Sequence, residues 1–274
     1  MQAHISGIIE NSQTLWPGRN CMVVFFSGCN YQCPFCFTPQ MLGFKQETLI
    51  DLRQVKKLIM QNNVAQAVMF TGGEPCLQKL ALLELAMFCK SAGFKVGLET
   101  NGSRPDVLEE ALQNGLVDFI RMDVKSPLDD AAIFDRVTVS STFFRSAPEL
   151  ADDVRASLEI LHSNESDIEL ELRTTIVPHI LYKKEDILNI ATMLKGFKSA
   201  WVLQKFMPKP ALANPRFSSI KPPSDEFMET IHNLVKKEYP FLRVELRLDM
   251  ADFSQLPDTD LKEFRTNPEE ALPE

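Results

Sequence analysis

Residues 21–40, CMVVFFSGCNYQCPFCFTPQ, place an apolar run directly before a loop that holds three cysteines. The run 21–26 has the length and the β-branched and aromatic content of a buried strand. The cysteines that follow it, Cys29, Cys33 and Cys36, have the spacing C-x3-C-x2-C. Most protein metal sites use four ligands, and no residue nearby in the sequence supplies an obvious fourth. This stretch therefore predicts a strand with an incomplete set of metal ligands at its carboxyl end.

Short apolar runs alternate with amphipathic helical stretches along the rest of the chain, which predicts a parallel sheet covered by helices. Six such strands are fewer than the eight of a closed (β/α)8 barrel. We therefore expect an α/β fold of the partial (β/α)6, TIM-like barrel type with outer helices; a doubly wound open sheet is the alternative. The predicted strands are 21–26, 66–70, 95–99, 117–122, 168–175 and 200–206, and the helices between them are 51–62, 78–92, 105–114, 150–163 and 183–196.

The carboxyl-terminal part of the chain predicts one more helix at 224–238 and a strand at 241–248. We find no internal repeat, low-complexity tract or long linker, and we expect a single domain over residues 1–254. Residues 255–274 are acidic and contain several prolines, which is typical of a tail on the protein surface.

Composition restricts the partners and the compartment. The net charge of -8 argues against a surface that coats nucleic acid. No apolar stretch approaches the roughly 20 residues of a membrane span, and the N-terminus lacks the pattern of a signal peptide. We therefore expect a cytoplasmic protein without a membrane partner. In a reducing cytosol, clustered cysteines indicate metal binding or catalysis rather than disulfides.

Polar groups follow each of the six predicted strands, at the edge where parallel α/β proteins bind their ligands. After the cysteine loop come TGGEP at 71–75, ETNG at 99–102 and DVK at 123–125. The last two strands end in RTT at 173–175 and pass through QK at 204–205. Turn residues alone would rarely place carboxylates and cations there so regularly. The pattern favours an enzyme over a non-enzymatic metal-binding or regulatory protein.

The incomplete cysteine set has two interpretations. A structural zinc site normally uses four ligands in two close pairs, and the four histidines lie far from the triplet in sequence. Thiolates also hold iron–sulfur clusters. A [4Fe-4S] cluster on three cysteines leaves one iron open to an added ligand, so the triplet favours a cluster over zinc or redox-sensing thiols.

The cysteine triplet, with Phe35 before its last member and GGEP further on, resembles the radical S-adenosylmethionine (SAM) superfamily. The triplet, GGEP, ETNG, DVK and RTT occur in that order, so the resemblance covers roughly residues 5–250. More narrowly, WPGRN, GCNYQCPFC, MDVKSP and RTTIVP resemble the activating proteins of anaerobic ribonucleoside-triphosphate reductase and other glycyl-radical enzymes.

This resemblance implies a [4Fe-4S] cluster on Cys29, Cys33 and Cys36, whose open iron binds SAM. It also implies reductive cleavage of SAM to a 5′-deoxyadenosyl radical, which abstracts hydrogen from a substrate. The implied partners are a glycyl-radical enzyme and, as electron donor, flavodoxin or ferredoxin.

The charges of SAM suggest which side chains would bind it. Glu74 would accept hydrogen bonds from the ammonium group, while Gly72 and Gly73 would let the backbone come close. The carboxylate requires a cation, which Lys125 or Arg173 could supply. In the glycyl-radical activating proteins, the position that matches Lys125 has this role.

Further candidates would contact the nucleoside or the reaction. Glu99 and Asn101 suit the sulfonium and the ribose, and Phe35 would flank the adenine. Cys76 is a candidate for a fourth thiolate, a radical relay or a small buried residue, and we favour the last.

Two positions depart from the activating proteins. Phe37-Thr38 stands where those proteins often have His-Asn, and Glu99 stands where they commonly have Asp. Glu at this point is also familiar in 7-carboxy-7-deazaguanine synthases, which share the cysteine spacing. The alternative function is therefore a radical enzyme that acts on a small molecule or a modified nucleoside.

Overall fold

The computed structural model describes residues 1–208 and 212–249, so the predicted tail at 255–274 lies outside the described residues. The strands are β1 (Gln2–Ser12), β2 (Cys21–Phe26), β3 (Leu49–Asp51), β4 (Ala67–Gly72), β5 (Lys95–Thr100), β6 (Phe119–Asp123), β7 (Glu169–Ile176), β8 (Ala200–Lys205) and β9 (Val244–Arg247). They form one sheet in the order β3-β1-β2-β4-β5-β6-β7-β8-β9. From β2 to β9 the pairing is parallel, whereas β1 and β3 add antiparallel strands at one edge.

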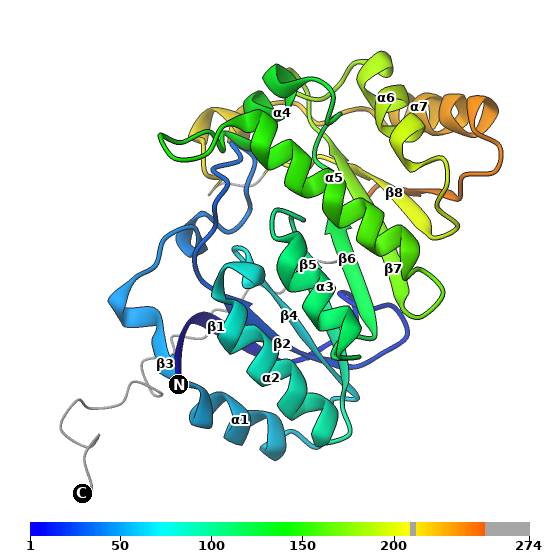
Figure 1. Ribbon diagram of the computed structural model, residues 1–274. Coiled ribbons are helices and arrows are strands. Elements are labelled where there is room, and N and C mark those ends of the chain that lie inside the picture. The colour runs from blue at the N-terminus through cyan, green and yellow to red at the C-terminus, as the bar shows by residue number, and fades with distance from the viewer. Residues whose placement is uncertain (209–211, 250–274) are drawn as a thin grey trace, which may run out of the picture.

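The helices start at local capping signals. Side chains of Asp51, Asp130 and Ser224 accept hydrogen bonds from backbone N–H groups at three helix starts, and Ser146 forms a capping box with Glu149 at a fourth. Figure 1 shows α1, α2, α3 and α5 together on one face of the sheet. The helices are α1 (Leu52–Gln61), α2 (Lys79–Ser91), α3 (Pro105–Gln113), α4 (Ala131–Thr138), α5 (Ala147–Ser163), α6 (Lys184–Leu194) and α7 (Asp225–Glu238).

Alternate residues of the parallel strands face opposite sides of the sheet. On β6, Ile120 and Met122 pack in the core beneath the helices, whereas Asp123 lines a cavity on the other, concave side. A smaller apolar cluster packs separately from the core beneath the helices: Leu15, Trp16, Cys21, Val23, Phe25, Met41, Ala67, Met69 and Phe119. The helix-facing side thus supplies most of the buried apolar surface that stabilises the fold.

The six predicted parallel strands are confirmed as β2, β4, β5, β6, β7 and β8, and their observed ends differ from the predicted ones by at most two residues. The predicted strand at 241–248 is present as the shorter β9. The two outer strands, β3 and β9, are not neighbours in the sheet. The sheet is therefore an open, partial barrel, as the sequence predicts.

Three elements, β1, β3 and α4, were missing from the sequence prediction. Strand β1 precedes β2 without an intervening helix, and its pairing with β2 shifts register between Ile5 and Gly7 and between Ile9 and Ser12. It therefore does not fit a pattern of alternating strands and helices. The short helix α4 was also missed, and α5 begins at Ala147 rather than at 150, because proline is tolerated in the first helical turn.

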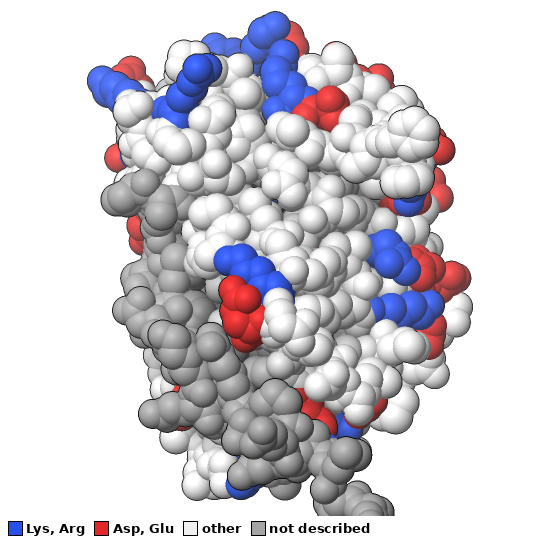
Figure 2. Space-filling model, turned by 90° about the vertical axis from the view of Figure 1, so that its left-hand side faces the viewer, with Lys and Arg blue, Asp and Glu red and all other residues white. Residues whose placement is uncertain are grey.

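Two further features concern the helices and the distribution of basic side chains. No helix within residues 1–208 and 212–249 has both the length and the apolar character needed to cross a membrane. Figure 2 shows one face of the molecule, on which Lys and Arg side chains stand singly or at the upper edge and form no continuous basic surface among the described residues.

Candidate functional site

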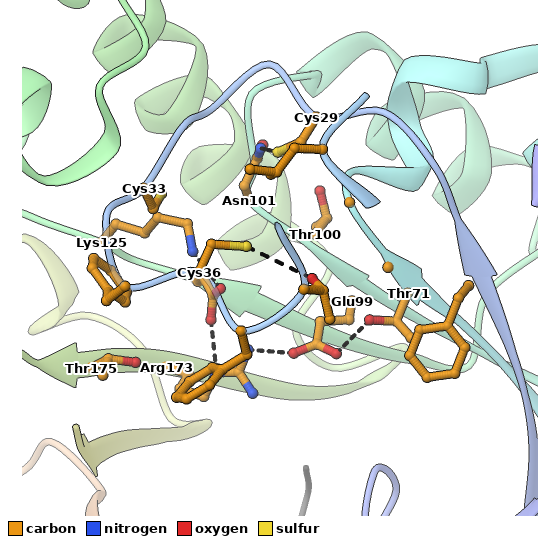
Figure 3. Close-up of a pocket in the computed structure, with 18 of the residues that line it drawn as sticks. Cys29, Cys33, Cys36, Thr71, Glu99, Thr100, Asn101, Lys125, Arg173 and Thr175 are labelled. Atoms are coloured by element: carbon orange, nitrogen blue, oxygen red, sulfur yellow. Dashed lines mark hydrogen bonds and ion pairs between the residues drawn. The ribbon is translucent and has the colours of Figure 1, made fainter. Parts of the chain in front are cut away.

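A cavity lies at the carboxyl ends of the parallel strands and encloses about 890 Å³ of space, part of it open to solvent. Residues on or directly after β2, β4, β5, β6, β7 and β8 line it, so the predicted common rim is present (Figure 3). Its lining includes the predicted residues Cys29, Cys33, Phe35, Cys36, Gly72, Gly73, Glu99, Asn101, Lys125 and Arg173, together with Phe25, Phe37, Thr38, Leu42, Thr71, Thr100, Asp123, Thr175 and Gln204.

The cysteine loop follows β2 and is held by main-chain hydrogen bonds to distant parts of the chain. The backbone N–H of Cys29 donates to the Leu42 carbonyl at 3.0 Å. At the other end of the triplet, the Ala213 N–H donates to the Cys36 carbonyl at 3.2 Å. These bonds fix the loop so that all three thiols line one cavity.

The three thiols suit a cluster better than a single ion. Within the described residues, no group of three His, Cys, Asp or Glu side chains is arranged to hold one metal ion. A [4Fe-4S] cluster is wider than an ion and binds each thiolate through a different iron, so its ligands stand further apart than those of tetrahedral zinc. Burial raises the pKa of Cys29, and it raises the pKa of Cys33 to about 12. If these thiols hold iron, its binding would have to displace their protons.

Gly72 and Gly73 let the GGEP turn pack against the cysteine loop. Gly72 has φ +121°, and a Cβ there would meet the Phe26 backbone, while a Cβ on Gly73 would meet the Gly28 carbonyl. The Gly73 N–H donates to the Phe26 carbonyl at 2.8 Å. The two glycines therefore let the GGEP turn approach the chain at Phe26 and Gly28 closely. Any larger residue would prevent this approach.

Glu74 is fully buried and is not among the residues that line the cavity. Its carboxylate accepts hydrogen bonds from the Asn101 N–H at 2.6 Å, the Thr100 hydroxyl at 2.8 Å and the Cys76 N–H at 3.0 Å. Burial raises the pKa of Glu74, and these hydrogen bonds oppose that effect. In this geometry Glu74 positions Thr100 and Asn101 behind the cavity wall, and its binding to the ammonium group of SAM stays a prediction.

A network of alternating charges lines the cavity across three strands. Arg173 donates to Glu99 through one nitrogen and to Asp123 through Nε at 2.7 Å. Lys125 donates to Asp123 at 2.6 Å, and the Thr71 hydroxyl donates to Glu99 at 2.8 Å. Two carboxylates thus alternate with two cations. Their mutual attraction offsets the free-energy cost of removing each charge from water.

The network also sets the protonation of its members. Burial alone would raise the pKa of Asp123, but Arg173 and Lys125 hold it well below its usual range. Burial alone would lower the pKa of Lys125, but Asp123 raises it above its usual range. Arg173 is 5% exposed and binds two carboxylates, whereas Lys125 binds one. Because an ammonium group has three donors, Lys125 is the better placed of the two predicted cations to bind a further carboxylate.

Asn101 and Phe35 line the cavity beside the thiols. The Asn101 amide donates to the Asn30 side chain at 3.0 Å, and its nitrogen lies 3.9 Å from the Cys29 sulfur. Phe35 stands directly before the last cysteine and is 7% exposed. Both therefore line the same cavity as the three cysteines, and their contacts with the nucleoside stay a prediction.

Cys76 lies outside the cavity. Its side chain is fully buried in the core beneath the helices, with Sγ 3.6 Å from the Thr100 hydroxyl. Burial raises its pKa well above the ordinary value. This environment agrees with the interpretation that we favoured, a small buried residue.

Several residues line the cavity although the sequence analysis gave them no individual role, among them Thr71, Thr175 and Gln204. Thr175 is two residues after Arg173 on β7 and so faces the same side of the sheet. Gln204 is its Cα partner on β8. The two-residue period of the strands was the signal that would have identified them.

Comparison with known proteins identifies the family of this chain. Residues 23–194 match the Radical SAM superfamily. A protein of Methanocaldococcus jannaschii with the provisional name glycyl-radical enzyme activating enzyme is 30% identical over 240 residues, which are 86% of this chain and 93% of that protein. The pyruvate formate-lyase-activating enzyme of Clostridium pasteurianum is 28% identical over 184 residues, 65% of this chain and 70% of that enzyme.

A solved structure supports the fold. The radical SAM methyltransferase from Sphaerobacter thermophilus aligns with a TM-score of 0.61 over 88% of this chain and 70% of its own, at 14% sequence identity. At this identity the likeness concerns the fold alone.

Proposed function

This chain belongs to the radical SAM superfamily, and from this premise we propose that it activates a glycyl-radical enzyme by removing a hydrogen atom from a glycine of that enzyme. An anaerobic ribonucleoside-triphosphate reductase is the partner that we propose first. The observation that carries the proposal is the similarity to the Methanocaldococcus jannaschii protein, which extends over 93% of that protein and is not confined to the cysteine loop.

Enzymes of this superfamily use a [4Fe-4S] cluster and SAM. When bound, these cofactors supply a 5′-deoxyadenosyl radical by reductive cleavage of SAM, and the protein supplies orientation and exclusion of water. In our proposal Cys29, Cys33 and Cys36 hold three irons of the cluster, and Lys125 binds the SAM carboxylate. We further propose that flavodoxin or ferredoxin provides the electron.

The remaining predicted residues orient the nucleoside in this proposal. Asn101 and Glu99 contact the ribose, and Phe35 flanks the adenine. Arg173 fixes the Glu99 carboxylate through their ion pair. Gly72 and Gly73 contribute indirectly, because they hold the GGEP turn against the cysteine loop.

The test uses anaerobic protein with its cluster reconstituted, a reductant, SAM and the ribonucleoside-triphosphate reductase of the same organism. We expect electron paramagnetic resonance to show a glycine-centred radical on the reductase. Cys33→Ala is the control, and it should form neither the radical nor 5′-deoxyadenosine. Wild-type protein that produces 5′-deoxyadenosine but no radical on any glycyl-radical enzyme of that organism would contradict the proposal.

The second candidate is a radical SAM enzyme that acts on a small molecule or a modified nucleoside, such as a 7-carboxy-7-deazaguanine synthase. Glu99 favours it, because Asp is commoner at this position in activating proteins. In this case deuterium from a labelled small substrate would enter 5′-deoxyadenosine without any partner protein. The two candidates therefore differ in where the abstracted hydrogen originates.

A further inference from the structure

Gln204, near the end of β8, has a buried amide whose oxygen is unpaired. Its side chain lines the same cavity as the cysteines and the residue is 2% exposed. Within the described part of the chain, Oε1 accepts no hydrogen bond. A buried acceptor without a partner destabilises a folded protein, and such atoms in native structures call for a specific reason. The Gln204 amide is therefore a candidate ligand-binding group.

Gln204 and Thr175 are uncharged, unlike the network beside them. Thr175 is the Cα partner of Gln204 on β7 and also lines the cavity. Figure 3 shows Thr175 beside Arg173, on the side of the cavity away from Cys29. All the charged side chains that line the described cavity belong to the network of β5, β6 and β7. Gln204 and Thr175 thus add an amide and a hydroxyl next to that network without adding a charge.

We propose that Gln204 and Thr175 form the substrate subsite, and that they bind a neutral peptide unit of the partner protein. The inference rests on the proposed function and names the group by which the substrate is recognised. A primary amide has an acceptor oxygen and two donor hydrogens, so it can pair with both the N–H and the C=O of a peptide. Rotation about the last torsion of Gln, which is broad and roughly two-fold, turns the oxygen toward the cavity.

A glycine substrate makes recognition through the backbone necessary. Glycine has no side chain to contact, so an enzyme that selects it has to bind the peptide groups on either side. SAM, in contrast, carries an ammonium, a carboxylate and a sulfonium, which match the charged network. A peptide unit has no net charge and needs only hydrogen-bond partners when it is buried. The uncharged pair Gln204 and Thr175 therefore suits a peptide unit better than it suits the charged groups of SAM.

A binding experiment tests the subsite without turnover. Anaerobic protein loaded with cluster and SAM is titrated with acetyl-Ala-Gly-Ala-amide and with the analogue that is methylated on the glycine nitrogen, and binding is followed by NMR. In wild-type protein we expect the methylated peptide to bind about tenfold more weakly, because it cannot donate a hydrogen bond to Gln204. In Gln204→Leu this difference should disappear, since the partner of the N–H group is gone. The affinity for SAM should not change.

Gln54→Leu is the matched control. Gln54, on α1, also has an Oε1 without a partner among the described residues, but it is not among the residues that line the cavity. This variant should keep the tenfold difference between the two peptides. Thermal unfolding without SAM should show that Gln204→Leu is at least as stable as wild type, because the substitution removes an unpaired buried acceptor.

Several outcomes overturn the subsite. The first is that wild-type protein binds neither peptide, or binds both with the same affinity. The second is that Gln204→Leu still binds the two peptides with different affinities. A loss of SAM affinity in Gln204→Leu also overturns it, since Gln204 would then belong to the cofactor site. Hydrogen abstraction is scored separately, by deuterium transfer from a peptide with deuterated glycine Cα to 5′-deoxyadenosine. If wild-type protein discriminates between the two peptides but transfers no deuterium to 5′-deoxyadenosine, the proposed function is refuted and the peptide subsite is retained.

Discussion

Neighbouring residues of β7 belong to two different regions of the molecule. Leu172 packs without solvent exposure in the core beneath the helices. Arg173, the next residue, lies on the concave side and joins Glu99 to Asp123. One region is stabilised by contacts that do not depend on direction, and the other by ion pairs that require particular partners.

This difference separates what holds the chain folded from what the cavity can bind. A residue on the helix-facing side can be exchanged for another apolar residue of similar volume at small cost. On the concave side the same change leaves a buried charge without its partner. Substitutions on the two sides should therefore produce different combinations of lost stability and lost cofactor binding.

The largest effects are expected at β7 itself. Arg173→Gln should lower the free energy of unfolding by about 3–5 kcal/mol, because the buried Glu99 loses the cation with which it pairs and Asp123 keeps only Lys125. It should also weaken SAM binding, since Glu99 loses the ion pair that fixes its position. Urea denaturation and equilibrium dialysis of cluster-loaded protein with SAM measure the two effects.

Leu172→Ala is the paired variant on the opposite side. The cavity left by the missing side chain should cost about 2–5 kcal/mol. Its SAM affinity, measured at a temperature where the protein is folded, should remain within about twofold of wild type, since the two sides share no hydrogen-bonded partner. A large loss of SAM affinity in Leu172→Ala would show that the two regions are not independent.

A smaller effect, on binding alone, is expected at Lys125. Lys125→Gln should weaken SAM binding about 10- to 100-fold, the magnitude of a lost hydrogen bond between charged groups. Stability should change little, because Arg173 still pairs with Asp123. Lys79→Gln is the control: it removes a lysine that pairs with Asp106 and Glu110 outside the cavity. Equal SAM affinities in the two variants would remove Lys125 from the cofactor site.

The sequence was most informative where the structure depends on local pattern. The strand at 21–26, the cysteine spacing after it and the polar residues at the strand ends are all visible in short windows, and the structure has them in place. The candidate cavity could therefore be predicted as a set of strand ends. The parallel arrangement of the strands followed from the alternation of strands and helices, whereas the order in the sheet is known only from the structure.

Pairing between distant residues could not be predicted in the same way. Arg173 binds Glu99 and Asp123, which are 74 and 50 residues away, so its choice of partner depends on the register of β5, β6 and β7. Glu74 could have faced the cavity or the adjoining loop, and only the folded turn decides that its oxygens accept from Thr100 and Asn101. An acidic residue in a motif thus predicts a charge at the rim but not which group it binds.

A modest effect is expected at Cys76, which lies on the helix-facing side although it follows the GGEP turn closely. Cys76→Ala should lower stability by about 1 kcal/mol through lost packing. The iron content and the rate of 5′-deoxyadenosine formation should stay unchanged, because the thiol does not line the cavity. Iron analysis and single-turnover assays measure both. A lower iron content would instead make Cys76 a ligand.

The smallest effect is expected at Asp118, a partly buried counterpart of Asp123 that directly precedes the other end of β6. Asp118 binds Lys90 at 2.8 Å and Lys95 at 2.7 Å, and it accepts the Val96 N–H at 2.9 Å. Burial opposes ionisation, but these partners lower the pKa of Asp118 below its ordinary value. A lowered folded-state pKa means that the stabilisation is complete above about pH 4 and is lost as the pH falls further. Because the lysines are largely solvated, the contribution should be only about 0.2–1 kcal/mol and should shrink in high salt.

Urea midpoints of wild type and Asp118→Asn should therefore differ at pH 6 and converge near pH 3. A difference that persists at pH 3 would mean that Asp118 stabilises the strand end through its hydrogen bond to Val96 rather than through its charge.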